Sequence, residues 1–194
     1  MDKERKFFDD KKNTLKKLKK AISKDIADQK ILPILDIINQ SENFYTSSSC
    51  AGRIALLELP SIGDKKNARF LGKWHRNIKP SEMISVSKNA KIGQLWLLAQ
   101  SPIIHITAKT NLDAEQMLKT VISSGFKNSG LKALGKKIVI EVCSTERLDA
   151  PVGKDGMLFC NEEYLHLLVE IANDVIDRSD LKLDRLKNGL KKKI

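Results

Sequence analysis

The chain has few of the features that mark secreted, membrane and fibrous proteins. It has three cysteines, Cys50, Cys143 and Cys160, and no Cys-x-x-Cys pair, so neither a disulfide framework nor a cysteine zinc site is expected. No apolar run approaches the roughly 20 residues of a membrane helix. The N-terminal segment lacks the apolar core of a signal peptide. We therefore expect a cytoplasmic protein with no membrane partner.

The common nucleotide-binding and metal-binding motifs are also missing. No Gly-x-Gly-x-x-Gly follows a strand-like segment, and no Walker loop is present, which disfavours a dinucleotide fold and a P-loop fold. The three histidines, His75, His105 and His166, lie in separate segments with no ligand spacing. No metal is therefore expected.

What the chain does have is basic charge at its ends. Its 194 residues carry a net charge of +11, with +6 on residues 1–24, +3 on residues 174–194 and +2 between them. Lys dominates both ends, which suits phosphate contact or simple solubility better than the reading of base edges. A nucleic-acid partner and merely solvated Lys-rich helical arms both agree with this charge.

Short strand patterns occur in pairs, with helix patterns between the pairs. Sequence patterns predict helices over residues 3–22, 28–39, 112–124 and 161–176, and a last basic helix or tail after residue 180. The pattern of residues 80–88 is ambiguous, with a short helix as one interpretation. Strands are predicted over residues 44–49, 53–59, 68–75, 93–99, 103–108, 137–143 and 157–160. Ser81 and Asn111 are expected to open the helices beside them. Residues 127–130 are expected to form a loop and residues 149–156 a turn region.

This order of elements favours the α+β class. We expect one compact domain over residues 1–194, with a largely antiparallel mixed sheet, flanking helices and no Rossmann fold.

A loop of small polar residues separates two predicted strands. It runs Ser47-Ser48-Ser49-Cys50-Ala51-Gly52-Arg53. Small residues let a ligand approach the backbone closely, and the hydroxyls with Arg53 suit an anion or a carboxylate. A polar turn without a ligand is the alternative.

Two further positions carry polar chemistry on strands. His105 alternates with Ile104 and Ile106, so it faces away from those two side chains. Trp74-His75-Arg76 is a cluster that can stack on a base and contact a phosphate, or cover an edge of the core.

An ordered set of residues then points to one family. The stretch Tyr45-Thr46-Ser47-Ser48-Ser49-Cys50-Ala51-Gly52-Arg53-Ile54 is similar to the Thr-Ser-Ser-Cys-(Ser/Ala)-Gly-Arg-Ile signature of that family, with one extra serine. In order there follow Gly72-Lys73-Trp74-His75-Arg76, Trp96, Pro102, His105, Ala114, Gly125-Phe126-Lys127-Asn128-Ser129-Gly130, Glu141, Ser144-Thr145-Glu146, Pro151 and Ala172-Asn173. Over residues 25–186 the chain resembles the archaeal single-domain form of the tRNA wybutosine-synthesizing protein 3 family.

The resemblance implies a tRNA methyltransferase. Members methylate the N4 atom of a tricyclic wybutosine precursor next to the anticodon of phenylalanine tRNA. The methyl donor is S-adenosylmethionine, held on a non-Rossmann fold. Because this donor is already activated, the enzyme mainly aligns the reacting atoms and removes a proton, which needs no metal.

For this reaction we expect one cleft lined by residues from several segments. The candidate catalytic residues are His75, His105 and Asp28. The candidate donor-binding residues are Ser48, Ser49, Cys50, Gly52 and Arg53. The candidate substrate-binding residues are Trp74, Arg76 and Asn173. Asp28 and Asn173 have helix capping as an alternative role, and the Lys-rich ends are expected to hold phosphates of the anticodon stem.

Two other functions fit the sequence less fully. One is a non-catalytic RNA-binding module that acts through its basic arms alone. The other is a small-molecule enzyme, such as an acyl transferase, that uses Cys50 and His105.

Overall fold

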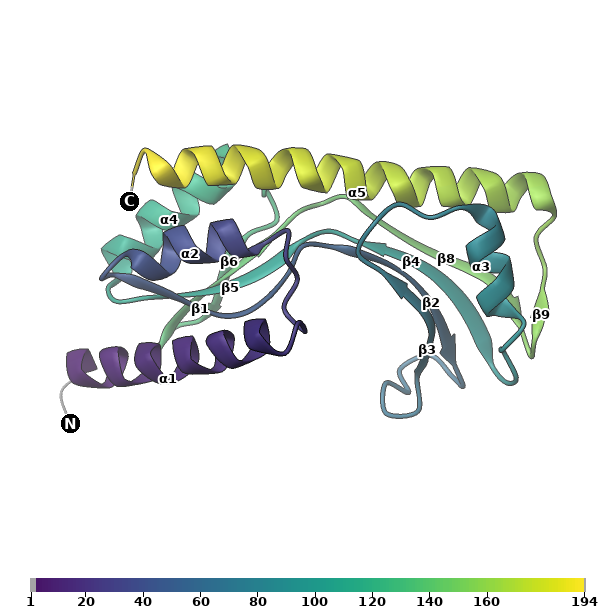
Figure 1. Cartoon of the computed structure of the whole chain (residues 1–194), viewed down its shortest axis with the longest axis horizontal. Coiled ribbons are helices and arrows are strands. Elements are labelled where there is room, and N and C mark those ends of the chain that lie inside the picture. Colours follow the sequence, from purple (N-terminus) through teal and green to yellow (C-terminus); the bar gives the residue numbers. More distant parts are fainter. Residues whose placement is uncertain (1–2, 194) are drawn as a thin grey trace. The chain divides into compact units, whose positions relative to one another are not determined.

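The computed structural model describes residues 3–193, which fall into two compact units (Figure 1). Unit 1 comprises residues 3–51, 102–145 and 180–193, and unit 2 comprises residues 52–101 and 146–179. Each unit is built around an antiparallel sheet of its own. The expectation of one domain over residues 1–194 stays a prediction.

Unit 1 is a sheet with helices on both faces (Figure 1). Its strand order is β1 (Phe44–Cys50), β5 (Ile103–Ala108), β7 (Ile138–Cys143) and β6 (Gly130–Ala133). The helices that cover one face are α2 (Leu32–Gln40), α4 (Asn111–Ser123) and the last turns of α5 (Glu162–Lys191). The opposite face meets α1 (Lys3–Ser23) through Phe7, whose ring lies 5.1 Å from that of Tyr45.

The alternation of the strands explains the core of unit 1. Ile104, Ile106 and Ile140 are fully buried under the helices, while His105 between the first two points to the other face. Burial of each such side chain contributes about 1.5–3 kcal/mol. The face predicted for His105 is therefore confirmed.

Unit 2 is a sheet with helices on one face only. Its strand order is β3 (Arg69–Trp74), β2 (Arg53–Leu59), β4 (Gln94–Gln100), β8 (Arg147–Lys154) and β9 (Met157–Leu158). Helix α3 (Pro80–Ser87) and the first turns of α5 pack on Leu56 and Leu97. The strand registers place Arg53, Phe70 and Trp96 together on the opposite face, which no helix of unit 2 covers.

These two sheets confirm the predicted α+β class. All the strand pairs are antiparallel, so the sheets are not of the Rossmann type. The strands predicted over residues 53–59 and 68–75 are also present, and they pair with each other as β2 and β3.

The helix predicted over residues 28–39 begins only at Leu32, and the two predicted caps, Ser81 and Asn111, were also wrong. Thr110, not Asn111, caps α4: its hydroxyl accepts from Asp113 N at 3.1 Å, and the Asp113 carboxylate accepts from Thr110 N at 3.0 Å. This reciprocal pair satisfies two backbone donors, so the helix begins one residue earlier than expected. Helix α3 begins at Pro80 and has Lys79, not Ser81, as its N-cap, because proline fits the first turn.

The predicted turn region over residues 149–156 was wrong for residues 149–154, which belong to β8 (Arg147–Lys154), and only residues 155 and 156 form a turn. Pro151 pairs with Trp96 beside an irregularity in the β4–β8 register, and β9 reaches only Gly153 and Lys154. Proline is found in sheets mainly at edges and irregularities of this kind. The expected loop at residues 127–130 likewise ends in β6, which begins at Gly130.

Helix α5 is continuous where two elements were predicted. It runs over 30 residues. Inside it the Ser179 hydroxyl donates to Val175 O at 2.6 Å, one turn back, so the polar stretch around residue 180 stays helical instead of capping a new helix. Within residues 3–193 no helix is both long and apolar enough to span a lipid bilayer.

Candidate functional site

A hydrogen-bonded chain of three side chains crosses the sheet of unit 1. The register places Ser48 on β1 opposite His105 on β5, and His105 opposite Glu141 on β7. Ser48 Oγ lies 2.7 Å from His105 Nδ1, and Glu141 Oε2 lies 2.8 Å from His105 Nε2. All three lie on the face away from the helix-covered core, where a ligand can approach them.

A β-bulge in β1 decides which serine hydroxyl joins this chain. Thr46 pairs with Ile106, and after a register shift Ser48 pairs with His105. A regular ladder would have put Ser47 opposite the histidine. The β-bulge therefore uses Ser47 as the unpaired residue and presents Ser48 to the imidazole.

The partners of His105 fix the positions of its protons. An ionised carboxylate only accepts hydrogen bonds, so Nε2 carries the proton that Glu141 accepts. In the neutral ring Nδ1 is then an acceptor, and the Ser48 hydroxyl donates to it. The hydrogen bond from His105 holds the pKa of Glu141 below its usual range, and Lys132, whose Nζ lies 3.2 Å from Glu141 Oε1, adds to this effect. The arrangement can accept one proton at Nδ1 and stabilise the resulting cation through Glu141.

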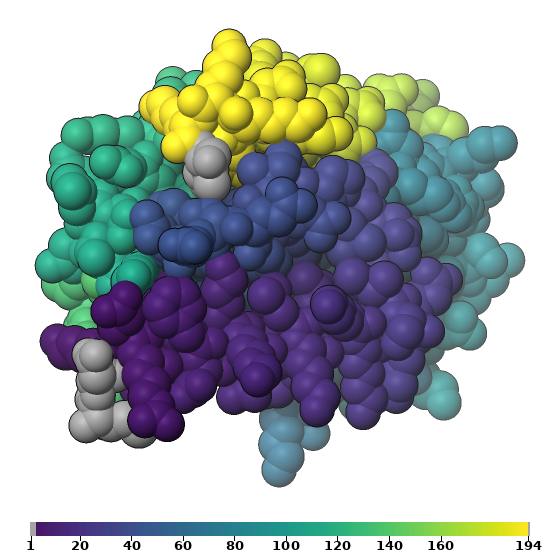
Figure 2. All heavy atoms as spheres, turned by 60° about the vertical axis from the view of Figure 1, so that its left-hand side comes forward, coloured from purple at the N-terminus to yellow at the C-terminus, as the bar shows by residue number. Residues whose placement is uncertain are grey.

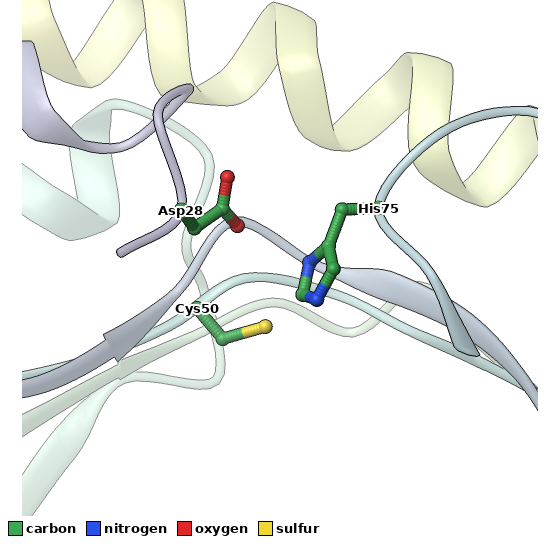
Figure 3. Close-up of side chains that lie close together, drawn as sticks. All are labelled: Asp28, Cys50 and His75. Atoms are coloured by element: carbon green, nitrogen blue, oxygen red, sulfur yellow. The ribbon is translucent and has the colours of Figure 1, made fainter. Parts of the chain in front are cut away.

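Asp28 lies near the end of β1 in unit 1. Its Oδ2 accepts from the backbone N–H of Ala51 at 2.9 Å, and a carboxylate oxygen lies within 4.8 Å of the Cys50 sulfur (Figure 3). Helix α2 has Ile31 at its N-cap, with no side-chain cap, so Asp28 holds the end of β1 and does not cap that helix. Ser49, the other hydroxyl expected to hold the donor, is exposed opposite Ile104.

His75, which Figure 3 also labels, belongs to unit 2 and follows β3. Its Nδ1 lies 3.0 Å from the carbonyl oxygen of Gly52. A carbonyl only accepts, so Nδ1 carries the proton and Nε2 is the basic nitrogen. Gly52 has φ +99, in the region that glycine adopts without strain, which explains the glycine before Arg53.

Arg53 lies on the uncovered face of the unit 2 sheet. Its Nε donates to Gln100 Oε1 at 2.8 Å, and its guanidinium carbon lies 5.3 Å from the centre of the Phe70 ring. Phe70 is about half exposed, at 49%. A guanidinium beside an exposed aromatic ring suits a ligand that combines a carboxylate with a flat or cationic group.

The three expected substrate-binding residues all contact other residues of unit 2. Trp74 packs against the core that the helices cover. Its ring lies over Gly72, and a Cβ at residue 72 would lie 2.1 Å from the Trp74 ring. Arg76 pairs with Glu82 at 2.7 Å. Asn173 makes two backbone hydrogen bonds to Ile78, each 2.9 Å long. Their predicted contact with substrate stays a prediction.

Sequence reasoning missed four side chains of these clusters: Glu141, Lys132, Phe70 and Gln100. For Glu141 the signal was its alternation with Ile140 and Val142, which puts it on the same kind of face as His105. Only the pairing of β5 with β7, distant in sequence, makes them partners.

Comparison with known proteins agrees with the resemblance found in the sequence. The family model described as Methyltransferase TYW3 matches residues 9–192. A Pyrococcus horikoshii protein, named tRNA(Phe) 7-((3-amino-3-carboxypropyl)-4-demethylwyosine(37)-N(4))-methyltransferase 1, is 46% identical over 181 residues, covering 93% of this chain and 92% of that one. A Methanocaldococcus jannaschii protein named for the same methyltransferase activity is 38% identical over 95% of this chain and 96% of its own.

Solved structures give the same result. A Pyrococcus horikoshii protein superimposes with a TM-score of 0.92 at 44% identity, covering 96% of this chain and 97% of that one. A hypothetical protein from Aeropyrum pernix superimposes with a TM-score of 0.74 at 28% identity, covering 85% and 98%. The expected family and the expected class of enzyme, a tRNA methyltransferase, are thereby confirmed. This chain belongs to the Methyltransferase TYW3 family.

Proposed function

We propose that this protein methylates the N4 atom of 7-(3-amino-3-carboxypropyl)-4-demethylwyosine at position 37 of phenylalanine tRNA, with S-adenosylmethionine as the donor. The observation that carries the proposal is the match, along almost the whole chain, with relatives named for this activity. The clusters of polar side chains in the two units supply chemistry that suits it.

The chain has two tasks in such a reaction. S-adenosylmethionine supplies, when bound, a methyl group whose bond to sulfur breaks, with the electron pair staying on sulfur, as the bond to N4 forms. This chain must align the ring nitrogen with that methyl group and accept the proton that the nitrogen loses. Alignment and proton acceptance are the two effects that side chains and backbone groups provide well.

We assign proton acceptance to His105. Its Nδ1 is the acceptor nitrogen because Nε2 donates to Glu141 at 2.8 Å. Ser48, at 2.7 Å from Nδ1, passes the proton from the substrate to the imidazole. Each proton moves one step, from N4 to Ser48 Oγ and from Ser48 Oγ to Nδ1. His75 is the second candidate acceptor, through Nε2, and Asp28 holds the backbone at the end of β1.

Arg53 is the residue best suited to the carboxylate of the donor. Its guanidinium is half-buried, is oriented by Gln100 and lies over Phe70. Phe70 fits a sulfonium or an adenine ring. The precursor base also carries an aminocarboxypropyl group, so a carboxylate is present on both molecules. Ser49, Cys50 and Gly52 would contribute mainly through their backbone, and Trp74, Arg76 and Asn173 by holding β3 and α3 in place.

Transfer of label from S-adenosylmethionine tests this function. The acceptors are phenylalanine tRNA that carries the demethylwyosine derivative and the same tRNA without it. We expect label in the first acceptor only. His105→Ala should reduce the rate by about 10²–10⁴-fold, the usual contribution of a general base. The matched control His166→Ala removes an exposed histidine of α5 that lies 3.9 Å from Glu162, and it should leave the rate unchanged. Label in neither acceptor, with wild-type protein that binds both, would contradict the proposal.

A further inference from the structure

A basic cavity opens in unit 1, away from the chain of Ser48, His105 and Glu141. Its volume is about 360 Å³, and it lies between the start of α1, the start of α4 and the turn that joins β6 to β7. Figure 2 shows the side of unit 1 on which α1 (purple) and α4 (teal) lie. The lining includes five lysines and one acidic residue, Asp10; the lysines are Lys3, Lys6, Lys109, Lys136 and Lys137.

Two of these lysines hold α1 against the sheet. Lys109 Nζ lies 2.6 Å from Glu4 Oε1, and Lys137 Nζ lies 3.0 Å from Asp10 Oδ2. The hydrogen bond that Lys137 donates to Asp10 raises the pKa of Lys137, and the hydrogen bond that Lys109 donates to Glu4 raises the pKa of Lys109. These two ion pairs fix α1 in place as one side of the cavity.

The other three lysines carry charge that the protein does not balance. Within residues 3–193 no acidic side chain forms an ion pair with Lys3, Lys6 or Lys136. Lys3 and Lys6 lie three residues apart at the start of α1, so they share one face of the helix. The start of a helix is the positive end of its dipole, where lysine is unfavourable. The start of α4, at Thr110 and Asn111, also borders this cavity, but there the Asp113 carboxylate offsets the helix end by accepting from Thr110 N at 3.0 Å.

This convergence of positive charge does not stabilise the free protein, and a bound anion would offset it. We propose that the cavity binds backbone phosphates of the RNA substrate. The proposal rests on the function proposed above and names a contact that the sequence assigned only to the Lys-rich ends in general.

The lining favours phosphate over a base. Lysine ammonium groups act as point charges that suit phosphate oxygens. The two aromatic side chains of the wall, Phe7 and Tyr45, are buried against each other, so neither of these rings is presented for stacking. A volume of about 360 Å³ is near the lower end of the range for small-ligand sites, which is roughly 300–1,000 Å³. A free nucleotide has the same phosphate chemistry, so the test must separate the two sources.

The first test compares two double variants. K6Q/K136Q removes two of the unbalanced lysines. The matched control K65Q/K66Q removes two exposed lysines in the turn between β2 and β3 of unit 2. Binding of an anticodon stem-loop RNA is measured by fluorescence anisotropy at several salt concentrations. Each lost phosphate contact should reduce the slope of log K against log salt by about 0.7–0.9, so K6Q/K136Q should reduce it by about 1.5. An unchanged slope for K6Q/K136Q, or an equal reduction in the control, would overturn the proposal.

The second test locates the contact and identifies the ligand. Surface lysines of the wild-type protein are acetylated briefly under three conditions: with no ligand, with the stem-loop RNA, or with adenosine monophosphate at an equal phosphate concentration. The extent of acetylation at each lysine is then measured by mass spectrometry. We expect the RNA to protect Lys6 and Lys136 but not Lys65 and Lys66, and the mononucleotide to protect none of them. Protection by the mononucleotide alone, or no protection at all, would overturn the proposal. Because this readout needs no methyl transfer, it separates a failure of the cavity from a failure of the proposed function.

Discussion

Glu141→Gln separates the charge of Glu141 from its shape. Glutamine fills the same space and can still accept from His105 Nε2, but it carries no charge to stabilise a protonated imidazole. His105 and Glu141 are 25% and 29% exposed, between a surface pair and a buried one. A hydrogen bond to a charged group contributes about 1.5–3 kcal/mol, and an exposed ion pair about 0.2–1 kcal/mol. For this half-buried pair we expect the charge of Glu141 to stabilise the protonated imidazole by about 1–2 kcal/mol. Loss of that stabilisation corresponds to a fall in kcat of about 5–30-fold.

The assay is methyl transfer to the precursor tRNA under saturating RNA and donor, with kcat and KM measured separately over a range of pH. Glu141 is a positioning residue that touches neither reactant in this proposal, so kcat should fall while KM for tRNA stays within about twofold. Glu115→Gln is the matched control, because Glu115 pairs with Lys119 on the exposed face of α4 at 2.6 Å. Glu115→Gln should unfold at nearly the wild-type temperature, since its exposed pair contributes little stability. An unchanged kcat in Glu141→Gln would refute the role assigned to the Ser48, His105 and Glu141 chain.

Three further predictions concern the scaffold of unit 2. Glu82→Gln should lower stability by the full amount above about pH 4.5 and by progressively less below it. The hydrogen bond from Arg76 lowers the pKa of Glu82 to about 2, so the contribution of this carboxylate to stability is lost as pH falls from 4.5 toward 2. Urea unfolding of the wild type and the variant at pH 7 and pH 2.5 checks this. An equal difference in unfolding free energy at both pH values would contradict it. Glu58→Gln should lower the free energy of unfolding in urea by about 1–3 kcal/mol. The reason is that the buried carboxylate accepts from the backbone N–H groups of residues 91 and 92 and pairs with Arg69. A loss below about 0.5 kcal/mol, that of an ordinary surface change, would contradict it. Gly72→Ala should lower the melting temperature, since the added Cβ would lie 2.1 Å from the Trp74 ring; an unchanged melting temperature with unchanged tryptophan fluorescence would contradict it.

The parts of the fold that were readable from sequence are those fixed by local patterns. The strand over residues 53–59 and the orientation of His105 follow from alternation along a few residues. The parts that were not readable depend on neighbours distant in the chain. β8 contains Pro151 and Gly153, which signal a turn. However, Gly153 is required because a Cβ there would lie 2.0 Å from Met157 O in the β8–β9 hairpin.

The candidate site divides in the same way. The serine-rich run and His105 stood out as chemistry-bearing residues, but the bulge that selects Ser48 exists only in the pairing of β1 with β5. Glu141 is 36 residues from His105 in sequence, and nothing local joins them. Phe70 and Arg53 likewise share a face only because β2 pairs with β3. Residue types were therefore readable, whereas their partners required the sheet registers.

The position of the transferred methyl group decides between a methyltransferase of this specificity and the alternatives. After reaction with the precursor tRNA and S-adenosylmethionine, the tRNA is digested to nucleosides, and the product is identified by mass spectrometry with fragmentation of the tricyclic base. We expect a single new nucleoside methylated at N4 of the residue at position 37, and none from tRNA that lacks the tricyclic base. A methyl group on any other atom, or an unchanged nucleoside profile despite tight tRNA binding, would contradict the proposed function.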